Sequence, residues 1–339
     1  MTHITAAELT ALITRALVAN RTGEGNATSV ARALVAAEID GQSGHGISRV
    51  ASYAAQSKVG KVDGHAVPTV ALTKPGAVLI DAAHGFAYPA LDLAIAKLPA
   101  MAKANGTATA AITRSHHAGV AGHTVERLAE LGLVALMFAN TPAAMAAAGG
   151  KRALFGTNPL AFACPMAGRP PLVIDLALST VARGKIVIAA RDGKAIPQGW
   201  AVDASGQPTT DAKAALAGTL LPLGGAKGAA LALMVEVLAA ALTGANFAFE
   251  ASPFLDDKGG PPGTGQLLLA IDAGAFGDGG FGMERSVLER VAVLATAIES
   301  DGARLPGSGR HALRKTAAQD GLAVDATVLA GIKAMAEVG

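Results

Sequence analysis

Cysteine is nearly absent from this sequence, which has one, Cys164, among 339 residues. A single cysteine excludes a disulfide within the chain and a cysteine-rich metal site. It also agrees with a cytoplasmic protein, because disulfide-dependent folds belong to oxidising compartments. Cys164 lies in the apolar run LAFACPM, so we expect a buried structural thiol there, the usual state of a free cysteine.

Aromatic residues and net charge are also scarce. Aromatic residues make up 4% of the sequence, while hydrophobic residues make up 51%. The core must therefore rest on many alanine, leucine and valine contacts, which favours closely packed helices. A formal net charge of +2 produces no field that would indicate nucleic acid or a membrane surface as a partner. A small anion held by a few local cations fits this charge.

Neither a signal peptide nor a membrane span is expected. Residues 1–15 lack a basic segment followed by an apolar one, the pattern of a signal peptide. The most apolar stretch, 228–249, has Glu236 in its middle, and a carboxylate there would be costly in lipid. We therefore expect a central buried helix of a soluble domain over 228–243.

Several nucleotide-binding and hydrolase motifs are missing. The run GEGNAT at 23–28 lies between two expected helices, which is not the strand-to-helix context of a dinucleotide-binding glycine loop. The sequence has no GxxxxGKS/T, HExxH, CxxC or GxSxG motif. A Rossmann cofactor site, a P-loop, a zinc protease and an α/β-hydrolase all lose support.

Helical and strand-like patterns alternate along the chain. A capping box from Thr5 to Glu8 starts a first helix, and a second is expected over about 26–40, ended by Gly41. The run 47–60 predicts a third. Further on, 70–82 and 160–179 read as strand pairs around Pro-Gly or Gly-Pro turns, while 107–112, 133–140 and 266–272 read as single strands. This mixture of hairpins and strand–loop–helix units predicts a mixed α/β sheet rather than a purely parallel one.

A first candidate site lies in the run SGHGISR, residues 43–49. Taken alone, a histidine between two glycines is more often a turn residue than a catalyst. Arg49 changes the interpretation, because a guanidinium can hold a carboxylate with two parallel hydrogen bonds. Gly44 and Gly46 on either side of His45 would let backbone and substrate approach closely.

A second candidate site is the pair His116 and His117, between an expected strand and an expected helix. Loops at such junctions carry chemistry, and an imidazole with an ordinary pKa of about 6.5 exchanges protons near neutral pH. The start of the helix also suits a phosphate. Neighbouring side chains on a strand point to opposite faces, so we expect no metal site; a surface pair is the plain alternative.

Two further clusters carry positive charge. Lys227 follows two glycines at the start of the long apolar helix, where free N–H groups and the helix dipole favour an anion. The C-terminal run ARLPGSGRHALRK, residues 303–315, groups basic residues around a Pro-Gly turn, which suits a phosphate such as a cofactor 2′-phosphate. An incidental lysine and a solvated basic tail are the corresponding plain alternatives.

Together, and in this order, these motifs resemble one family. The matching runs are DGQSGHGISR, SHHAGVAG, FGTNPLAF, VIDLALSTVARGK, IPQGWAVDASGQPTTD, LPLGGAKGAALALMVE, GPPGTGQLLLAID and RLPGSGR. They cover nearly the whole chain. The sequence is similar to the malate/L-lactate dehydrogenase-like oxidoreductases, most of all to their Δ1-piperideine-2-carboxylate/Δ1-pyrroline-2-carboxylate reductase branch.

The resemblance implies a fold and an activity. The fold is mixed α/β, with a non-Rossmann, largely antiparallel sheet that binds the dinucleotide, and the assembly is a homodimer. It implies a helical N-terminal region with a substrate loop over 1–68, a cofactor- and substrate-binding core over 69–300, and a basic turn and helix over 301–339 that return to the N-terminal region. The activity is reduction of a cyclic imino acid to L-proline or L-pipecolate, with NADPH, or alternatively NADH, as the donor.

The resemblance also assigns residues. The catalytic residues it implies are His45, Ser43 and Lys185. The substrate-binding residues it implies are Arg49, Thr157, Arg183 and Gly184. The cofactor-binding residues it implies are His117, Ala118, Gly119, Val120, Ala121, Asp175, Leu176, Ala177, Ala226, Lys227, Arg304, Leu305, Pro306, Gly307, Ser308, Gly309 and Arg310.

This chain departs from the family pattern at two positions. The family commonly reads Ser-His-Gly, whereas this chain has Gly44 before His45, with Ser43 one place early. The reductase branch places an aspartate proton donor just after ARG, whereas this chain has Lys185. The route of the proton to the imine nitrogen is therefore open.

Two alternatives stand beside imine reduction. One is an NAD-dependent 2-hydroxy-acid dehydrogenase of the malate, lactate or ureidoglycolate type, in which His117 is the base. The other is a non-catalytic dinucleotide-binding homologue, which Gly44 and Lys185 motivate. In all three cases the expected partner is a small molecule, with no nucleic acid, membrane or metal ion.

Overall fold

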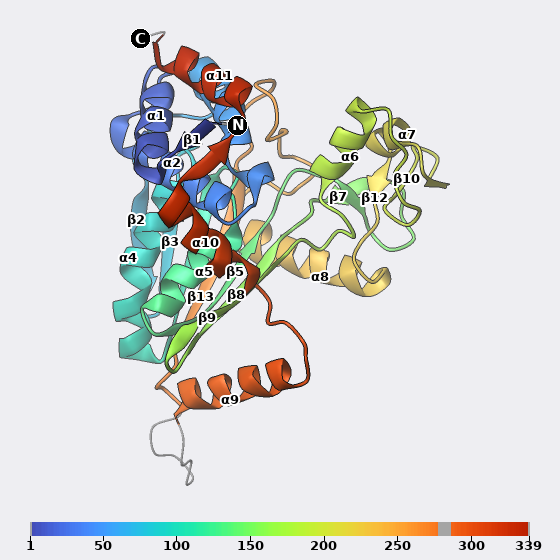
Figure 1. The fold of residues 1–339 in the computed structure, drawn as a ribbon. Helices are drawn as coiled ribbons and strands as arrows, with labels where there is room; N and C mark the ends of the chain where they lie inside the picture. The colour runs from blue at the N-terminus through green and yellow to red at the C-terminus, as the bar shows by residue number, and fades with distance from the viewer. Residues whose placement is uncertain (1, 277–285, 338–339) are drawn as a thin grey trace.

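A seven-stranded sheet forms the body of the protein in the computed structural model, which describes residues 2–276 and 286–337 (Figure 1). In order across the sheet the strands are β2 (Thr69–Lys74), β3 (Ala77–Asp81), β4 (Thr107–Ser115), β13 (Thr264–Asp272), β5 (Leu133–Ala139), β8 (Leu160–Met166) and β9 (Arg169–Leu176). Only β3 and β4 pair in parallel; the other neighbours are antiparallel. The expected mixed α/β fold with a largely antiparallel sheet is confirmed.

Two helices cover one face of this sheet. α4 (Ala87–Asn105) connects the parallel strands β3 and β4, and α5 (Ala121–Glu130) packs on β5, β8 and β9. Strand β4 alternates, so that Ala108, Ala110 and Ile112 are fully or almost fully buried. Small side chains at these positions let the helices lie close to the sheet, as the alanine-rich composition predicted. Cys164 in β8 is buried, which confirms the structural thiol.

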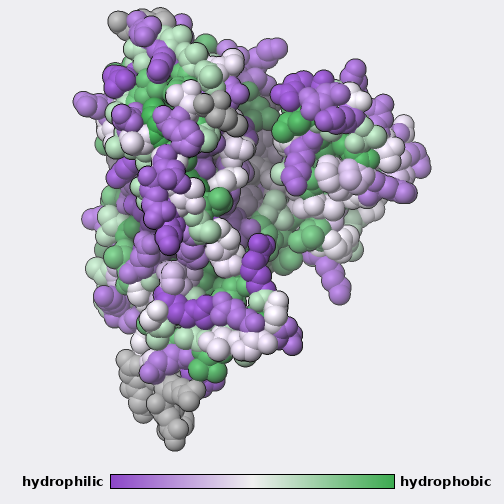
Figure 2. Space-filling view, viewed as in Figure 1, coloured by the Kyte–Doolittle hydropathy of each residue, from purple (hydrophilic) through white to green (hydrophobic). Residues whose placement is uncertain are grey.

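A second, smaller lobe stands apart from the body at the right of Figure 1. Its short strands, in order across the sheet, are β11 (Pro208–Thr209), β10 (Ala201–Val202), β12 (Thr219–Leu220), β6 (Met145–Ala146) and β7 (Ala153–Phe155). Helices α6 (Arg183–Arg191) and α7 (Ala212–Ala217) pack beside them. The space-filling view shows a hollow between this lobe and the body (Figure 2).

The two ends of the chain meet in a helical layer. The elements from the N-terminal end are β1 (Thr2–Ile4), α1 (Ala6–Val18), α2 (Glu24–Ile39), the 3₁₀ turns η1 (Ser43–His45) and η2 (Ile47–Arg49), and α3 (Val50–Val59). Those from the C-terminal end are α10 (Gly309–Asp320), β14 (Leu322–Val324) and α11 (Ala326–Glu337). β1 pairs with β14, and α11 packs on α1. Thr5 and Glu8 form the predicted capping box.

The apolar run after Lys227 differs from the expectation of a buried helix over 228–243. It forms α8 (Ala226–Glu236) and continues as the π-helical turn η3 (Val237–Ala241). One side packs on the sheet, but Leu233 is 51% and Val237 51% exposed in the single chain. Glu236 faces inward and accepts hydrogen bonds from Asn158, Asn140 and the Ala248 N–H. The polar partners of Glu236 therefore hold the helix by one face, and its other face is left uncovered.

The remaining helix, α9 (Val287–Ser300), extends from the lower end of the body (Figure 1). Ala295 packs with Met166 and Leu305 in a small cluster of its own. Residues 277–285, inside the range predicted as core, lie outside the described residues. Among the helices that the structure describes, none is long and apolar enough to cross a membrane.

Candidate active site

Six residues from distant parts of the chain form one largely buried group, called here the histidine cluster: His45, Tyr53, Tyr88, His116, His117 and Phe254. His45 comes from the turn η1, the two tyrosines from α3 and α4, and the histidine pair from the loop that follows β4. The structure thus brings together the first two candidate sites predicted from sequence, SGHGISR and SHHAGVAG.

The loop that carries His45 is shaped by Gly46. A Cβ atom added at Gly46 would lie 2.2 Å from the Glu38 carboxylate, and that same carboxylate accepts a hydrogen bond from the Ile47 N–H at 3.1 Å. Gly44 differs, since nothing lies within 4 Å of a Cβ placed there. Close packing therefore requires the second glycine of the motif but not the first.

His117 makes the cluster's shortest polar contact. Its Nδ1 lies 2.6 Å from the hydroxyl of Tyr53, which lies 3.3 Å from the hydroxyl of Tyr88. The ring of His117 also stacks on that of His45, with centroids 5.3 Å apart and planes 19° apart. Sequence reasoning assigned His117 but missed both tyrosines, since nothing in the local sequence marks a helix residue as a partner of a histidine 64 positions away.

His116 has a different set of partners and points away from that contact. Its Nε2 lies 2.8 Å from Gln56 Oε1, and the Gln56 amide donates to the Phe254 carbonyl at 2.8 Å. The Phe254 ring covers both histidines, at 5.1 Å from His116 and 5.2 Å from His117. His116 is thus held as a buried neutral imidazole that supports the cluster.

The environment keeps these histidines uncharged. Burial, together with the positive charges of Arg49 and His123, lowers the pKa of His45 to about 4. Burial, Lys61 and Arg49 lower the pKa of His116 to about 3. Burial also lowers the pKa of His117 well below its ordinary value, with His45, Arg49 and His116 adding to the effect. Positive charge on the rings of the cluster is therefore disfavoured.

Arg49 supplies the fixed positive charge beside the cluster. Its Nε donates to the Gly44 carbonyl at 2.7 Å, which ties the guanidinium to the loop. Within the part of the chain that the structure describes, its two terminal nitrogens have no hydrogen-bond partner. They are the donors that a substrate carboxylate would take.

Ser43 forms no side-chain hydrogen bond to His45 within the described residues: its carbonyl accepts from Ser48, and His45 Nδ1 is buried without a partner. A Ser43–His45 relay thus stays a prediction.

The other predicted substrate residues lie toward the smaller lobe. Thr157 donates its N–H to Thr141 at 2.9 Å. Arg183, Gly184 and Lys185 begin α6, where Arg183 reaches the Leu216 carbonyl at 3.5 Å and Lys185 is exposed. No described hydrogen bond or ring contact joins these residues to the histidine cluster, so their contact with a substrate stays a prediction.

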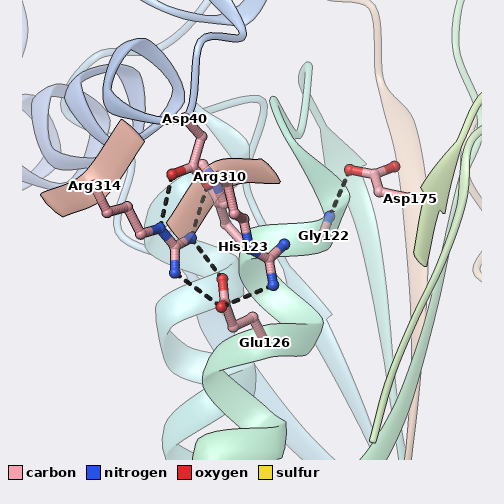
Figure 3. Close-up of polar contacts among 7 residues, drawn as sticks. All are labelled: Asp40, Gly122, His123, Glu126, Asp175, Arg310 and Arg314. Atoms are coloured by element: carbon pink, nitrogen blue, oxygen red, sulfur yellow. Dashed lines mark hydrogen bonds and ion pairs between the residues drawn. The ribbon is translucent and has the colours of Figure 1, made fainter. Parts of the chain in front are cut away.

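The predicted cofactor residues lie before α5, at the end of β9, at the start of α8 and in the segment 304–310 that leads into α10. Asp175 accepts a hydrogen bond from the Gly122 N–H at 2.7 Å (Figure 3), next to the predicted run 117–121. Lys227 is exposed at the start of α8. In the loop 304–310, Gly307 has φ +72°, and a Cβ there would lie 2.8 Å from the Val173 carbonyl, so this loop approaches the sheet more closely than any other residue type allows.

Two arginines of the basic C-terminal run are paired with buried acids (Figure 3). Arg314 bridges Asp40 at 2.7 Å and Glu126 at 2.8 Å, and Arg310 reaches Glu126 at 2.9 Å. His123 contacts Asp40 at 2.9 Å. Burial by itself raises the pKa of Asp40, but the hydrogen bonds from His123 and Arg314 outweigh it and hold that pKa well below its ordinary value.

A dinucleotide fits this arrangement of residues. The Nε of Arg310 is buried and has no acceptor among the described residues, and a phosphate oxygen is the acceptor it would suit. The start of α5 beside Gly119 adds backbone N–H groups. No group of three or more His, Cys, Asp or Glu side chains arranged for a metal ion occurs within residues 2–276 and 286–337.

Comparison with known proteins identifies the family and the fold. The family model for malate/L-lactate dehydrogenases matches residues 4–333. The chain therefore belongs to the malate/L-lactate dehydrogenase family, a family of oxidoreductases. Its shared fold is shown by a crystal structure of Δ1-piperideine-2-carboxylate reductase from Pseudomonas syringae, with a TM-score of 0.92 and 39% identity over 99% of this chain and 100% of that one.

Two curated relatives carry different activities in their names. The (2R)-3-sulfolactate dehydrogenase (NADP(+)) of Chromohalobacter salexigens is 51% identical over 84% of both chains. The Δ1-pyrroline-2-carboxylate/Δ1-piperideine-2-carboxylate reductase of Pseudomonas putida is 43% identical over 91% of both. One fold and family thus includes enzymes for two chemically different small acids.

Proposed function

We propose that this chain is an oxidoreductase that uses NADPH to reduce cyclic imino acids, Δ1-pyrroline-2-carboxylate and Δ1-piperideine-2-carboxylate, to L-proline and L-pipecolate. The observation that carries the proposal is the guanidinium of Arg49, with its terminal nitrogens uncommitted, beside the neutral, stacked rings of His45 and His117. The likeness to the Pseudomonas reductases over almost the whole chain supports it.

The chain's residues would act by orientation and charge placement. Arg49 would hold the substrate carboxylate, and the apolar rings of Phe254 and Phe86 around the histidines would limit water. The loop 304–310, Lys227 and the start of α5 would hold the cofactor phosphates. A bound NADPH would supply the hydride for the C=N carbon, and the imine nitrogen would take its proton from the histidine cluster.

A kinetic panel tests this function. Purified protein is assayed for NADPH and NADH oxidation with Δ1-pyrroline-2-carboxylate and Δ1-piperideine-2-carboxylate, beside pyruvate and oxaloacetate. Turnover of the imino acids with NADPH is the expected result. Turnover of the keto acids alone contradicts the proposed substrate, and cofactor binding with no turnover of any acid selects a non-catalytic homologue.

A second candidate is oxidation of a 2-hydroxy acid that carries a second anionic group, such as 3-sulfolactate. The 51% identity to the sulfolactate dehydrogenase favours it. Such a substrate needs two cationic partners, and the exposed Lys185 at the start of α6, where the reductase branch has an aspartate, could be the second beside Arg49. Reduction of NADP⁺ by 3-sulfolactate in the unmodified protein, with no turnover of the imino acids, would select this candidate, and Lys185→Ala should then raise the KM for 3-sulfolactate.

We further propose that the enzyme works as a homodimer. Leu231, Leu233, Val237 and Leu242 are exposed apolar side chains on α8 and the turns that follow it, with exposed fractions of 41, 51, 51 and 64%. An exposed apolar surface is typical of an interface. The chain has a mass of 33.6 kDa, and light scattering on the purified protein is expected to give twice that value. The Leu233→Lys variant is expected to give the mass of a single chain.

A further inference from the structure

The hydroxyl groups of Tyr53 and Tyr88 and the ring of His117 form one buried chain of hydrogen bonds. Tyr53 is fully buried and Tyr88 is 6% exposed. Their described hydrogen bonds form one chain, from Tyr88 to Tyr53 at 3.3 Å and from Tyr53 to His117 Nδ1 at 2.6 Å. A neutral imidazole carries its hydrogen on one nitrogen only, so two orientations of the chain are conceivable.

Only one orientation satisfies all the donors. If Tyr88 donates to Tyr53 and Tyr53 donates to His117 Nδ1, each hydroxyl hydrogen has an acceptor and the ring hydrogen lies on Nε2. In the opposite orientation Nδ1 donates to Tyr53, Tyr53 donates to Tyr88, and the Tyr88 hydrogen has no acceptor among the described residues. A buried donor without an acceptor is costly. The short 2.6 Å contact is also typical of a hydroxyl donor.

The remaining nitrogen of His117 is the one open to a ligand. No described residue bonds to Nε2, and His117 keeps 9% of its surface exposed. We propose that Tyr53 is a positioning residue that fixes His117 with its hydrogen on Nε2, and that Tyr53 supplies a hydrogen to Nδ1 when Nε2 gives its own to the substrate.

The chemistry balances without an imidazolium. When the substrate carbon receives a hydride, the electron pair of its double bond moves to the heteroatom, which takes the hydrogen from Nε2. Nδ1 takes the Tyr53 hydrogen, and the Tyr53 oxygen takes that of Tyr88, so the negative charge that leaves the substrate heteroatom rests on the Tyr88 oxygen until the shift reverses. The shift reverses when water enters the emptied site and protonates Nε2. Burial and Arg49 disfavour a charged His117, and burial also raises the pKa of Tyr53 and Tyr88, so the charge on Tyr88 lasts only until the shift reverses.

The inference rests on the proposed function in one respect: the substrate must take a proton when it receives a hydride. This holds for an imine and for a ketone alike. Its first test needs no turnover. Nitrogen-15 NMR of histidine-labelled protein distinguishes the two tautomers, and we expect His117 to show the Nε2–H form. Tyr53→Phe is expected to give a mixture, whereas Tyr88→Phe, which also removes a buried hydroxyl but leaves the Tyr53 contact, is expected to keep the Nε2–H form. An Nδ1–H ring in the unmodified protein overturns the proposal.

The second test is kinetic and uses whichever acid the enzyme reduces. Tyr53→Phe is expected to lower kcat about 100-fold, within the range of general acid catalysis, with KM nearly unchanged because Arg49 is intact. Its kcat should also rise as pH falls, since a ring without the Tyr53 hydrogen can donate only as the imidazolium. Thermal melting and NADPH binding confirm that the variant is folded. A folded Tyr53→Phe enzyme with normal kcat and a normal pH profile overturns the relay.

Discussion

The rings of His45 and His117 stack 5.3 Å apart although they belong to segments separated by the whole of α3, β2, β3, α4 and β4. A positive charge on either ring would lie against the other and near Arg49, so both are held neutral. The positive charge of Arg49 thus acts on two uncharged rings that can carry protons. Such a site suits a carboxylate whose neighbouring carbon is reduced or oxidised.

Arg49→Ala is expected to raise KM for the carboxylate substrate and to lower kcat/KM by about 100-fold or more, because a charge-assisted bidentate contact contributes roughly 3 kcal/mol. Arg49→Lys should recover only part of the loss, since an ammonium lacks the planar fork. Steady-state kinetics measure both. Unchanged kcat/KM in Arg49→Ala would remove Arg49 from substrate binding.

The histidine cluster should make the folded state less stable as the pH falls. His45 and His116 have pKa values lowered from an ordinary 6.5 to about 4 and about 3, so below pH 6.5 the unfolded chain binds protons that the folded chain does not. Their contribution is complete above pH 6.5 and is lost as pH falls toward those values, by at most about 1.4 kcal/mol per pH unit for each histidine. Urea unfolding from pH 7.5 to 4.5 measures the slope, and His45→Asn should reduce it; an equal slope in that variant contradicts a neutral His45.

Arg314→Met is expected to destabilise the fold by about 3–5 kcal/mol, because it leaves Asp40 and Glu126 buried with fewer partners. Arg32→Met is the matched control: Arg32 also pairs with an aspartate, but its side chain is 62% exposed, and loss of such a pair costs about 1 kcal/mol or less. Chemical denaturation compares them, and similar losses in both would show that the buried network has no special role.

Lys61→Met should loosen the segment that carries Phe254. The Lys61 side chain is fully buried, and its Nζ donates to the carbonyls of Pro253 and Lys258, both at 2.6 Å, and of Asp256 at 2.9 Å. Its loss leaves these acceptors without a donor, which should lower the free energy of unfolding by about 2–4 kcal/mol. It should also free the Phe254 ring from its contacts with the two histidines. Lys58→Met, at an exposed position of α3 three residues before Lys61, should change neither stability nor kcat; hydrogen exchange over 252–262 and kinetics report the difference.

Gly44→Ser should be tolerated, since the structure leaves open space for a Cβ there, whereas Gly46→Ser should destabilise the loop by displacing the Glu38 carboxylate. Melting temperatures test the contrast. If a serine before His45 completes a proton relay, Gly44→Ser will also raise kcat. An unchanged kcat in the folded variant would show that this serine is not required in this chain.

Much of the fold follows from local patterns. The strands β4, β5 and β13 carry alternating or continuous apolar runs, and Thr5 and Glu8 start α1 by contacts three residues apart. The apolar composition of α8 predicts a helix buried on all sides, but periodicity does not distinguish a face that packs on the same chain from a face that another chain covers. Only the packing of Glu236 and the sheet shows which face is covered.

Some residues of the candidate site can be predicted from the sequence, and others are found only in the structure. His45, Arg49 and His117 stand in motifs that glycine spacing and family order make visible, so the sequence by itself determined the mixed α/β fold, the family and the residue types available for chemistry. Tyr53, Tyr88, Gln56 and Phe254 carry no local signal, because their partners lie 35 to 198 positions away. Only the tertiary structure decided which nitrogen of His117 is engaged and which is open, since a hydrogen bond depends on distance and direction in space and not on separation along the chain.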